Sequence, residues 1–214
     1  MAGFFITFEG GEGTGKSTQI KMLATYLQSR GIAPILTKEP GGTEVGQELR
    51  RLLVTGDKDK FDAVAEALLY YADRRIHLQQ KILPALAAGQ WVLSDRFADS
   101  TKAYQYYGYN KRVPEEVLDS LYKIAVGNFY PDLTIILDID PKIGLERSLR
   151  RNQSEASAEV RFEGRELEFH NNLRQGFLEI AKTSPRYAVL DADTTIENLH
   201  RQIVQLVEER LLNK

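Results

Sequence analysis

The sequence predicts an α/β domain in which helices flank a parallel sheet of five strands. Short apolar runs alternate along the chain with longer segments of helical periodicity. Several of these runs are apolar at nearly every position, which is typical of strands that helices cover on both faces. In such a sheet, binding sites lie at the carboxyl ends of the strands. The strands are predicted at residues 4–8, 33–36, 91–93, 133–137 and 187–190.

The segments between these strands are long enough to serve as crossover helices. One predicted helix spans residues 65–86, and the last begins near Ile196 and repeats apolar residues at spacings of three and four. Thr194 and Glu197 at its start have the spacing of a capping box. The chain has 214 residues and no low-complexity linker, so a single domain is predicted over residues 1–214.

Composition narrows the classes of function. The chain has no cysteine, which excludes disulfides, cysteine-based zinc sites and a cysteine nucleophile, and which fits the cytoplasm. Its 28 basic and 30 acidic residues give a formal net charge of -2, so a basic surface for nucleic acid is not expected. No apolar run approaches the roughly 20 residues that span a bilayer, and the start lacks the pattern of a signal peptide. We therefore expect a cytoplasmic protein that binds neither nucleic acid nor membrane.

The strongest motif is a phosphate-binding loop. It follows a predicted strand and opens a predicted helix, a context that disfavours the alternative of a flexible glycine-rich turn. Glycines let successive backbone N–H groups turn toward phosphate oxygens, while Lys16 reaches the β- and γ-phosphates and Ser17 coordinates Mg²⁺. The motif thus predicts a P-loop NTPase fold that binds a nucleoside triphosphate. Its residues are Gly10-Gly11-Glu12-Gly13-Thr14-Gly15-Lys16-Ser17, a match to Gly-x-x-x-x-Gly-Lys-[Ser/Thr].

The end of the third strand separates three classes of P-loop protein. A GTPase would carry an Asn-Lys-x-Asp element, which the sequence lacks, and a motor ATPase would end this strand in Asp-Glu. Here the strand ends in Asp95-Arg96-Phe97. A carboxylate beside an arginine suits Mg²⁺ on one side and an anionic second substrate on the other, with a structural ion pair as the alternative. The pattern favours a small-molecule kinase.

A second Asp-Arg pair lies within the predicted helix 65–86. Tyr70 and Arg74 are four residues apart, so they share one face of that helix. Alone, this pattern indicates an amphipathic helix with core tyrosines. Beside the phosphate loop and the pair Asp95-Arg96, it indicates an aromatic ring and a guanidinium that hold the base and phosphate of an acceptor nucleotide.

Together these motifs resemble the thymidylate kinases, and the resemblance covers nearly the whole chain. Two elements are far more specific than the phosphate loop, because adenylate, guanylate and shikimate kinases lack them. They are Glu39-Pro40-Gly41-Gly42-Thr43 and the run Asp95-Arg96-x-x-x-Ser100-Thr101-x-Ala103-Tyr104-Gln105. The resemblance implies a nucleoside monophosphate kinase-like fold and transfer of the γ-phosphoryl group of ATP to dTMP, which gives dTDP and ADP.

The resemblance also implies a role for each site residue. Tyr70 takes the place of the ring that stacks on thymine, and Tyr104 packs beneath the sugar, where it favours deoxyribose. Glu12 lies near the sugar 3′-hydroxyl, with Glu39 as a further carboxylate of that pocket. The arginines expected around the acceptor monophosphate are Arg50, Arg74 and Arg96, and the residues expected at the thymine edge are Thr101 and Gln105. ATP is expected on Gly10 to Thr18, and Mg²⁺ on Ser17 and Asp95.

An arginine-rich segment follows the fourth strand. Its centre, residues 152–159, is polar and without periodicity, so it is either a solvated loop or a mobile lid. Because the phosphate loop contains no arginine, the resemblance implies the bacterial arrangement, in which a lid at about 148–164 supplies the charge. Arg151 and Arg161 would then be catalytic together with Lys16 and Arg96, since phosphoryl transfer depends mainly on positioning and charge neutralisation.

The sequence leaves several alternatives open. The resemblance implies a homodimer. The segment 106–109, Tyr-Tyr-Gly-Tyr, replaces a smaller glycine-rich sequence, and it either reshapes the base pocket or packs against a neighbouring subunit. A kinase of another pyrimidine nucleotide or of a deoxynucleoside is therefore an alternative, and a sensor that binds MgATP without transfer is a rival. Arg186 is a candidate to border the adenine. Three histidines without metal-ligand spacing are expected in surface or packing positions, namely His77, His170 and His200.

Overall fold

A parallel sheet of five strands in the order β2-β3-β1-β4-β5 forms the centre of the protein. The computed structural model describes residues 3–57, 59–155 and 165–213, and within the helix that ends at Glu155 it describes side chains as far as Arg150. The strands are β1 (Phe5–Glu9), β2 (Ile35–Lys38), β3 (Val92–Asp95), β4 (Leu133–Asp138) and β5 (Tyr187–Asp191). All five predicted strands and the α/β class are confirmed, and each strand ends one or two residues later than predicted.

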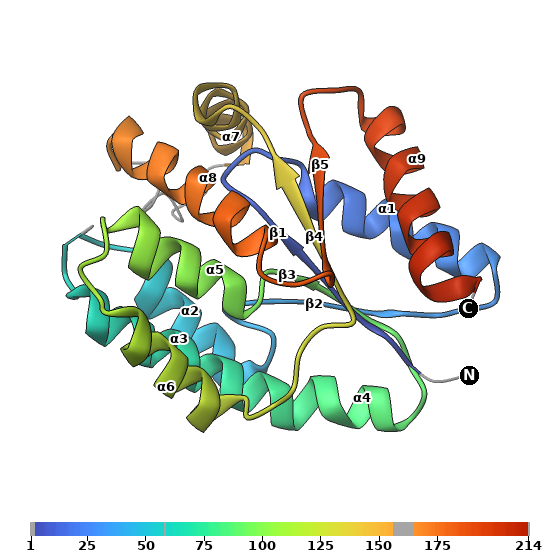
Figure 1. Cartoon of the computed structure of the whole chain (residues 1–214), viewed down its shortest axis with the longest axis horizontal. Helices are drawn as coiled ribbons and strands as arrows, with labels where there is room; N and C mark the ends of the chain where they lie inside the picture. Colours follow the sequence, from blue (N-terminus) through green and yellow to red (C-terminus); the bar gives the residue numbers. More distant parts are fainter. Residues whose placement is uncertain (1–2, 58, 156–164, 214) are drawn as a thin grey trace.

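Helices cover both faces of this sheet (Figure 1). Helices α1 and α9 lie on one face, whereas α3, α5, α6 and α8 lie on the other (Figure 1). The predicted helix 65–86 is formed by α3, the π-helical segment η1 and α4 in succession. The α-helices are α1 (Lys16–Ser29), α2 (Glu44–Val54), α3 (Ala63–His77), α4 (Leu83–Ala87), α5 (Ala98–Lys102), α6 (Glu115–Ala125), α7 (Pro141–Glu155), α8 (Leu167–Ala181) and α9 (Ile196–Val207). The π-helical segments are η1 (Leu78–Ile82), η2 (Ala103–Gly108) and η3 (Glu208–Leu212).

Alternation of side chains along β1 assigns its residues to the two faces. Ile6 and Phe8 belong to the hydrophobic core shared with α1 and α9, whereas Phe5 belongs to the core shared with α3, α4 and α6. Because successive side chains of a strand point to opposite faces, Thr7 and Glu9 lie on the same face as Phe5. The central strand therefore presents a carboxyl group to the α5 side, directly before the phosphate loop.

A row of five hydroxyl groups crosses this second face of the sheet. Its members occupy neighbouring register positions on all five strands, namely Thr37, Ser94, Thr7, Thr134 and Tyr187. Thr7 and Thr134 are hydrogen bonded to each other at 2.9 Å, and the Ser94 hydroxyl donates to the carbonyl of Arg96 at 2.8 Å. A buried hydroxyl is costly without a partner. This hydroxyl row therefore offers fixed hydrogen-bonding positions to the segments that lie over it.

One predicted boundary is wrong, and part of the predicted lid segment is helical. The capping box at Thr194 is replaced by a cap one residue later, because Thr195 has the extended backbone of an N-cap and its hydroxyl accepts from the Asn198 backbone N–H at 3.2 Å. Helix α7 continues to Glu155, so residues 152–155 are helical and not part of a loop. These residues are polar and show no apolar periodicity, so the sequence did not indicate that the helix includes them. The rest of the predicted lid, residues 156–164, lies outside the described residues.

Candidate active site

The phosphate loop holds the amino group of Lys16 within its own curve. Lys16 Nζ donates to the carbonyls of Gly10 at 3.1 Å and Gly11 at 2.7 Å, and it contacts Thr14 Oγ1 at 3.3 Å. Burial, together with the nearby charge of Arg96, lowers the pKa of Lys16 from 10.5 to about 8. A polyphosphate that binds beside this helix N-terminus would therefore stabilise the charged form of Lys16.

The two residues predicted to hold Mg²⁺ are in direct contact. The hydroxyl of Ser17, in the first turn of α1, donates to Asp95 Oδ2 at 2.8 Å, although the two residues come from different segments of the chain. Both supply the hard oxygen ligands that Mg²⁺ prefers. Among the described residues, no group of three or more acidic, histidine or cysteine side chains forms a metal cluster. The pair therefore fits an ion that takes most of its ligands from phosphates and water.

Arg96 connects the phosphate loop to α5 and η2. Its backbone has a φ of 72°, a left-handed conformation that is uncommon for a residue with a side chain. The guanidinium donates to the carbonyl of Gly10 at 2.9 Å, to Ser100 Oγ at 3.0 Å and to Tyr104 Oη at 2.9 Å. It also forms an ion pair with Glu12 at 3.0 Å. Backbone strain of this kind occurs at functional sites, where the surroundings enforce it.

Glu12 projects from the phosphate loop into this cluster as a carboxylate. The Tyr104 hydroxyl donates to Glu12 Oε1 at 2.6 Å. Burial alone would raise its pKa, but the charges of Arg96 and Lys16 and the Tyr104 hydrogen bond lower the pKa of Glu12 to about 2. Glu12 is therefore ionised near neutral pH and can accept a hydrogen bond from a substrate hydroxyl.

Arg74 lies in a separate buried cluster. Its Nε donates to Glu39 Oε2 at 2.8 Å, and its Nη2 donates to Thr101 Oγ1 and to the carbonyl of Phe97, both at 3.0 Å. The guanidinium also lies over the Tyr71 ring, 4.8 Å from its centroid. The structure thus joins three predicted acceptor residues, Arg74, Glu39 and Thr101, through hydrogen bonds that do not include Arg96.

Two buried polar groups in this region have unused hydrogen-bonding capacity. Arg74 Nη1 and both amide atoms of Gln105 find no hydrogen-bond partner among the described residues. Gln105 is completely buried. Native proteins rarely leave such groups unpaired, because each costs about 1–3 kcal/mol. Their position next to Thr101 fits a polar ligand that offers both donors and acceptors.

The rings of the predicted acceptor pocket pack together. Tyr70 lies against the hydrophobic core that contains Tyr104 and Phe169, and the rings of Tyr104 and Phe169 have centroids 6.0 Å apart. Tyr71, the neighbour of Tyr70 on α3, faces a different core. Tyr70 and Tyr104 therefore lie on the same side of α3, as the predicted pocket requires.

Side chains from α2, α3 and η1 hydrogen bond to the backbone of the Glu-Pro-Gly-Gly-Thr loop between β2 and α2. Arg50 Nη1 donates to the carbonyl of Pro40 at 2.9 Å, Asp73 Oδ1 accepts from the Gly41 N–H at 3.1 Å, and Lys81 Nζ donates to the carbonyl of Gly42 at 3.1 Å. Arg50 thus reaches the loop from α2, which brings it to the acceptor side of the sheet.

A pocket extends from the phosphate loop toward α8. Its lining includes Gly11, Glu12, Asp138 and Arg174. The last two form a two-point ion pair, because Arg174 Nε and Nη2 donate to the two Asp138 carboxylate oxygens, each at 2.7 Å. This pair fixes one wall of the site at the carboxyl end of β4.

Sequence reasoning missed two buried acidic groups on this face. The Glu9 carboxyl group accepts from the Phe97 N–H at 2.8 Å and is hydrogen bonded to the Ser100 hydroxyl. Burial and the charge of Asp99 raise the pKa of Glu9 to about 8. Asp99 in turn forms a two-point pair with Arg186, each contact at 3.0 Å. A glutamate at the end of an apolar strand could have been recognised in the sequence as a buried acidic group. The partners of Asp99 are remote in sequence, so no local pattern could have indicated its burial.

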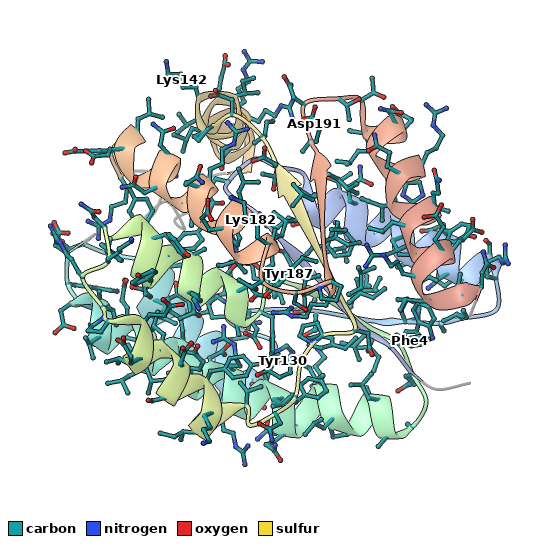
Figure 2. The ribbon with its side chains drawn as sticks, in the orientation of Figure 1. Phe4, Tyr130, Lys142, Lys182, Tyr187 and Asp191 are labelled. Carbon is teal, nitrogen blue, oxygen red and sulfur yellow. The ribbon has the colours of Figure 1, made fainter. Side chains whose placement is uncertain are left out.

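Arg186 does not lie at the carboxyl edge of the sheet. It precedes Tyr187 at the start of β5, and Figure 2 shows Tyr187 and Asp191 at opposite ends of that strand. The phosphate loop follows the carboxyl end of β1, and the sheet is parallel. Arg186 therefore lies at the edge of the sheet opposite the phosphate loop, and this position gives no support to a contact with adenine.

The tyrosine-rich segment packs within the chain. A side chain at Gly176 of α8 would collide with the Tyr107 ring, and the Tyr109 hydroxyl donates to Glu66 at 3.0 Å. Arg165 donates to the same hydroxyl at 3.0 Å. This segment therefore braces α3 and α8 against each other. The side chain of Arg151 and the whole of Arg161 lie outside the described residues.

Fold and site together define a P-loop kinase of the nucleotide kinase class, in which Arg96 links the phosphate loop to α5 and η2. A profile of the thymidylate kinase family matches residues 8–203. The chain belongs to the thymidylate kinase family. It is 46% identical over 210 residues to a thymidylate kinase of Maridesulfovibrio salexigens, which covers 97% of this chain and 96% of that protein.

Two further relatives agree with this assignment. A thymidylate kinase of Magnetococcus marinus is 46% identical over 211 residues, which covers 98% of each chain. The crystal structure of thymidylate kinase from Ehrlichia chaffeensis superimposes with a TM-score of 0.76 at 32% identity, over 97% of this chain and 99% of that one. The predicted family and fold are therefore confirmed. No helix in the described part of the chain is long and apolar enough to cross a membrane.

Proposed function

We propose that the cluster around Arg96 carries out the thymidylate kinase reaction of this chain, ATP + dTMP → ADP + dTDP. The observation that carries the proposal is the set of contacts made by one guanidinium. Arg96 bonds the phosphate loop through Gly10 and Glu12, and the acceptor side through Ser100 and Tyr104. A single fixed cation therefore lies between the donor site and the acceptor site, where a phosphoryl group in transfer needs its charge stabilised.

On the donor side, ATP is the phosphoryl donor, and we assign its phosphates to the backbone of Gly10 to Thr18. Lys16 would neutralise charge on the transferred group. Ser17 and Asp95 would hold Mg²⁺, which would neutralise negative charge on the phosphates. The support for this assignment is the 2.8 Å contact between the two oxygen ligands.

On the acceptor side, we assign thymine to the space beside Tyr70, Thr101 and Gln105. The unpartnered amide of Gln105 and the unpartnered Nη1 of Arg74 support polar recognition of the base edge. The contact between Arg74 and Thr101 favours a place for Arg74 near the base, which differs from the expected place at the monophosphate. Arg50 and Arg96 remain the proposed phosphate ligands.

Tyr104 and Glu12 would recognise the sugar. The Tyr104 hydroxyl is fixed by two partners, Glu12 at 2.6 Å and Arg96 at 2.9 Å, so the ring cannot swing away from a bound sugar. A rigid ring beneath the sugar disfavours a ribose 2′-hydroxyl, and the ionised Glu12 accepts from the 3′-hydroxyl. The catalytic roles of Arg151 and Arg161 and the lid at about 148–164 remain predictions.

The experiment that tests the site compares acceptors in a coupled assay of ADP release with MgATP. We expect strong turnover with dTMP, weaker turnover with dUMP, and little with UMP, AMP or thymidine. Tyr104→Phe is the matched variant, because it keeps the ring and removes both hydroxyl contacts. Turnover with UMP equal to that with dTMP would discard the proposed sugar site and leave the phosphate loop intact.

We also propose that the chain forms a homodimer through α2, α3 and α6. These helices lie side by side (Figure 1), and they expose large apolar side chains. Leu52 and Leu68 are each 51% exposed, and Ile124 is 77% exposed. Exposed apolar groups gathered on adjacent helices are typical of an interface. Leu68→Glu should convert a sedimentation mass of two chains to that of one, and a one-chain mass for the unmodified protein would contradict the proposal.

The cytoplasm remains the proposed location, because the absence of cysteine fits a reducing compartment. Fractionation of the source cells, with the kinase activity followed in each fraction, tests it. Activity recovered outside the cytoplasmic fraction would overturn this assignment.

A further inference from the structure

His77, the last residue of α3, is completely buried between two residues of the β2 end of the sheet. Its Nδ1 lies 2.8 Å from Glu39 Oε1, and its Nε2 lies 2.7 Å from Thr37 Oγ1. Thr37 is the first member of the hydroxyl row. The sequence suggested a packing or surface position for this histidine, yet both ring nitrogens are engaged in hydrogen bonds.

The two hydrogen-bond partners determine which nitrogen of the His77 ring carries the hydrogen. An ionised carboxylate only accepts hydrogen bonds, so Nδ1 must carry the hydrogen that meets Glu39. In the neutral ring, Nε2 then accepts from the Thr37 hydroxyl, which can rotate to donate. Glu39 thereby sets the tautomer, and Thr37 satisfies the other ring nitrogen and helps to hold the Nδ1 donor in front of Glu39.

Glu39 transmits this constraint to Arg74. With Oε1 taken by His77, the other oxygen, Oε2, accepts from Arg74 Nε at 2.8 Å. The orientation of the planar guanidinium follows from that contact, so that Nη2 reaches Thr101. The continuous chain of contacts runs from Thr37 through His77, Glu39 and Arg74 to Thr101.

The His77 ring also supports the loop between β2 and α2. A side chain at Gly42 would meet His77 Cδ2 at 2.4 Å, so the loop backbone rests directly on the ring. Arg50 holds the same loop through the carbonyl of Pro40. One buried ring therefore contacts both the chain of residues that leads to Arg74 and the loop to which Arg50 is hydrogen bonded.

We propose that His77 is a positioning residue for the acceptor nucleotide. Through Glu39 it orients Arg74 and Thr101 toward the base of dTMP, and it has no part in binding ATP. This inference rests on the acceptor site proposed above. If His77 were only a packing residue, its loss would lower stability without a selective effect on one substrate.

The test compares His77→Phe with His77→Asn. Phenylalanine keeps the ring and removes both hydrogen bonds, whereas the asparagine amide can still present a donor close to the Nδ1 position. Since a hydrogen bond to a charged group contributes about 1.5–3 kcal/mol, we expect His77→Phe to raise KM for dTMP by about tenfold to a hundredfold. KM for ATP should stay within about twofold, and His77→Asn should recover most of the loss. His200→Phe, on α9 at the other face, is the matched control and should leave both KM values unchanged.

A milder variant covers the case in which His77→Phe does not fold. Thr37→Val keeps the shape of the side chain and removes only the Nε2 partner, so a rise of about twofold to fivefold in KM for dTMP is expected. Equal changes in both KM values, or failure of His77→Asn to restore activity, would overturn the inference. Absence of dTMP turnover in the unmodified protein would instead reject the proposed acceptor site before any variant is compared.

Discussion

The backbone of Gly13 in the phosphate loop lies directly against the carbonyl of Gly144 in the first turn of α7. A side chain at Gly13 would come within 1.9 Å of that carbonyl, and a side chain at Gly144 would come within 2.4 Å of the Glu12 carbonyl. Gly13 also has a φ of 67°, which disfavours any other residue. Two glycines therefore let α7 approach the phosphate loop at backbone distance.

Gly144→Ala should displace α7 from the phosphate loop. Overpacking of a tight contact costs about 1–3 kcal/mol, so we expect a lower midpoint of urea unfolding and weaker binding of MgATP. Gly11→Ala is the control for stability, because no atom lies within 4 Å of the added group. Equal unfolding midpoints for the two variants would show that the α7 contact is not tight in solution.

The affinity for MgATP should fall as the pH rises above about 8. The pKa of Lys16 is lowered to about 8 by burial and by Arg96, so the free protein loses this cation in that range. Bound phosphates favour the charged form, and binding above pH 8 must therefore take up a proton.

Calorimetric titration of MgATP at pH 8.5, in two buffers of different ionisation enthalpy, measures this uptake. Lys16→Arg stays charged and should show none. The same uptake in both proteins would assign the proton to another group.

The free energy of unfolding should decrease as the pH rises toward 8.5. The pKa of Glu9 is raised from 4.5 to about 8, so the folded protein holds a proton that the unfolded chain has released. Stability from this group is complete below about pH 4.5 and is lost as the pH rises through about 8, by at most about 1.4 kcal/mol for each pH unit.

Urea unfolding of Glu9→Gln at pH 6.5, 7.5 and 8.5 isolates this group. Burial and Glu39 raise the pKa of Asp73 only to about 6, so Asp73 titrates mainly below this window. Glutamine cannot titrate, and the variant should show a flatter dependence on pH than the unmodified protein. A parallel decline in both proteins would mean that Glu9 is ionised throughout.

Asp95→Asn should increase the concentration of Mg²⁺ needed for half-maximal activity. The amide keeps the size of the side chain and can still accept from Ser17, but it removes one negative charge beside the metal position. Changes to outer-shell groups around a metal typically reduce metal affinity or activity by about tenfold to a hundredfold, and we expect an effect of that size. A Mg²⁺ titration of the kinase assay measures the shift, with Asp193→Asn, at an exposed position, as control. Identical titration curves would remove Asp95 from the metal site.

Much of the site was predictable because its motifs are local. The phosphate loop is contiguous, and the strand before it and the helix after it are set by adjacent residues. The contact between Ser17 and Asp95 also follows from sequence, since the carboxyl ends of parallel strands meet at one edge. The cap of α9 was predicted wrongly and the helical state of residues 152–155 was not predicted, because polar residues carry weak periodic information.

The sequence by itself determined the class of fold, the family and the residues of the phosphate loop, because hydrophobic periodicity and short motifs depend on neighbours along the chain. Only the tertiary structure decided the burial and the hydrogen-bond partners of His77, Glu9 and Asp99. Their partners lie far away in sequence, and the register of the sheet and the packing of α3 and α5 bring them together. A buried polar group is defined by the atoms that surround it, and those atoms are specified only when the chain is folded.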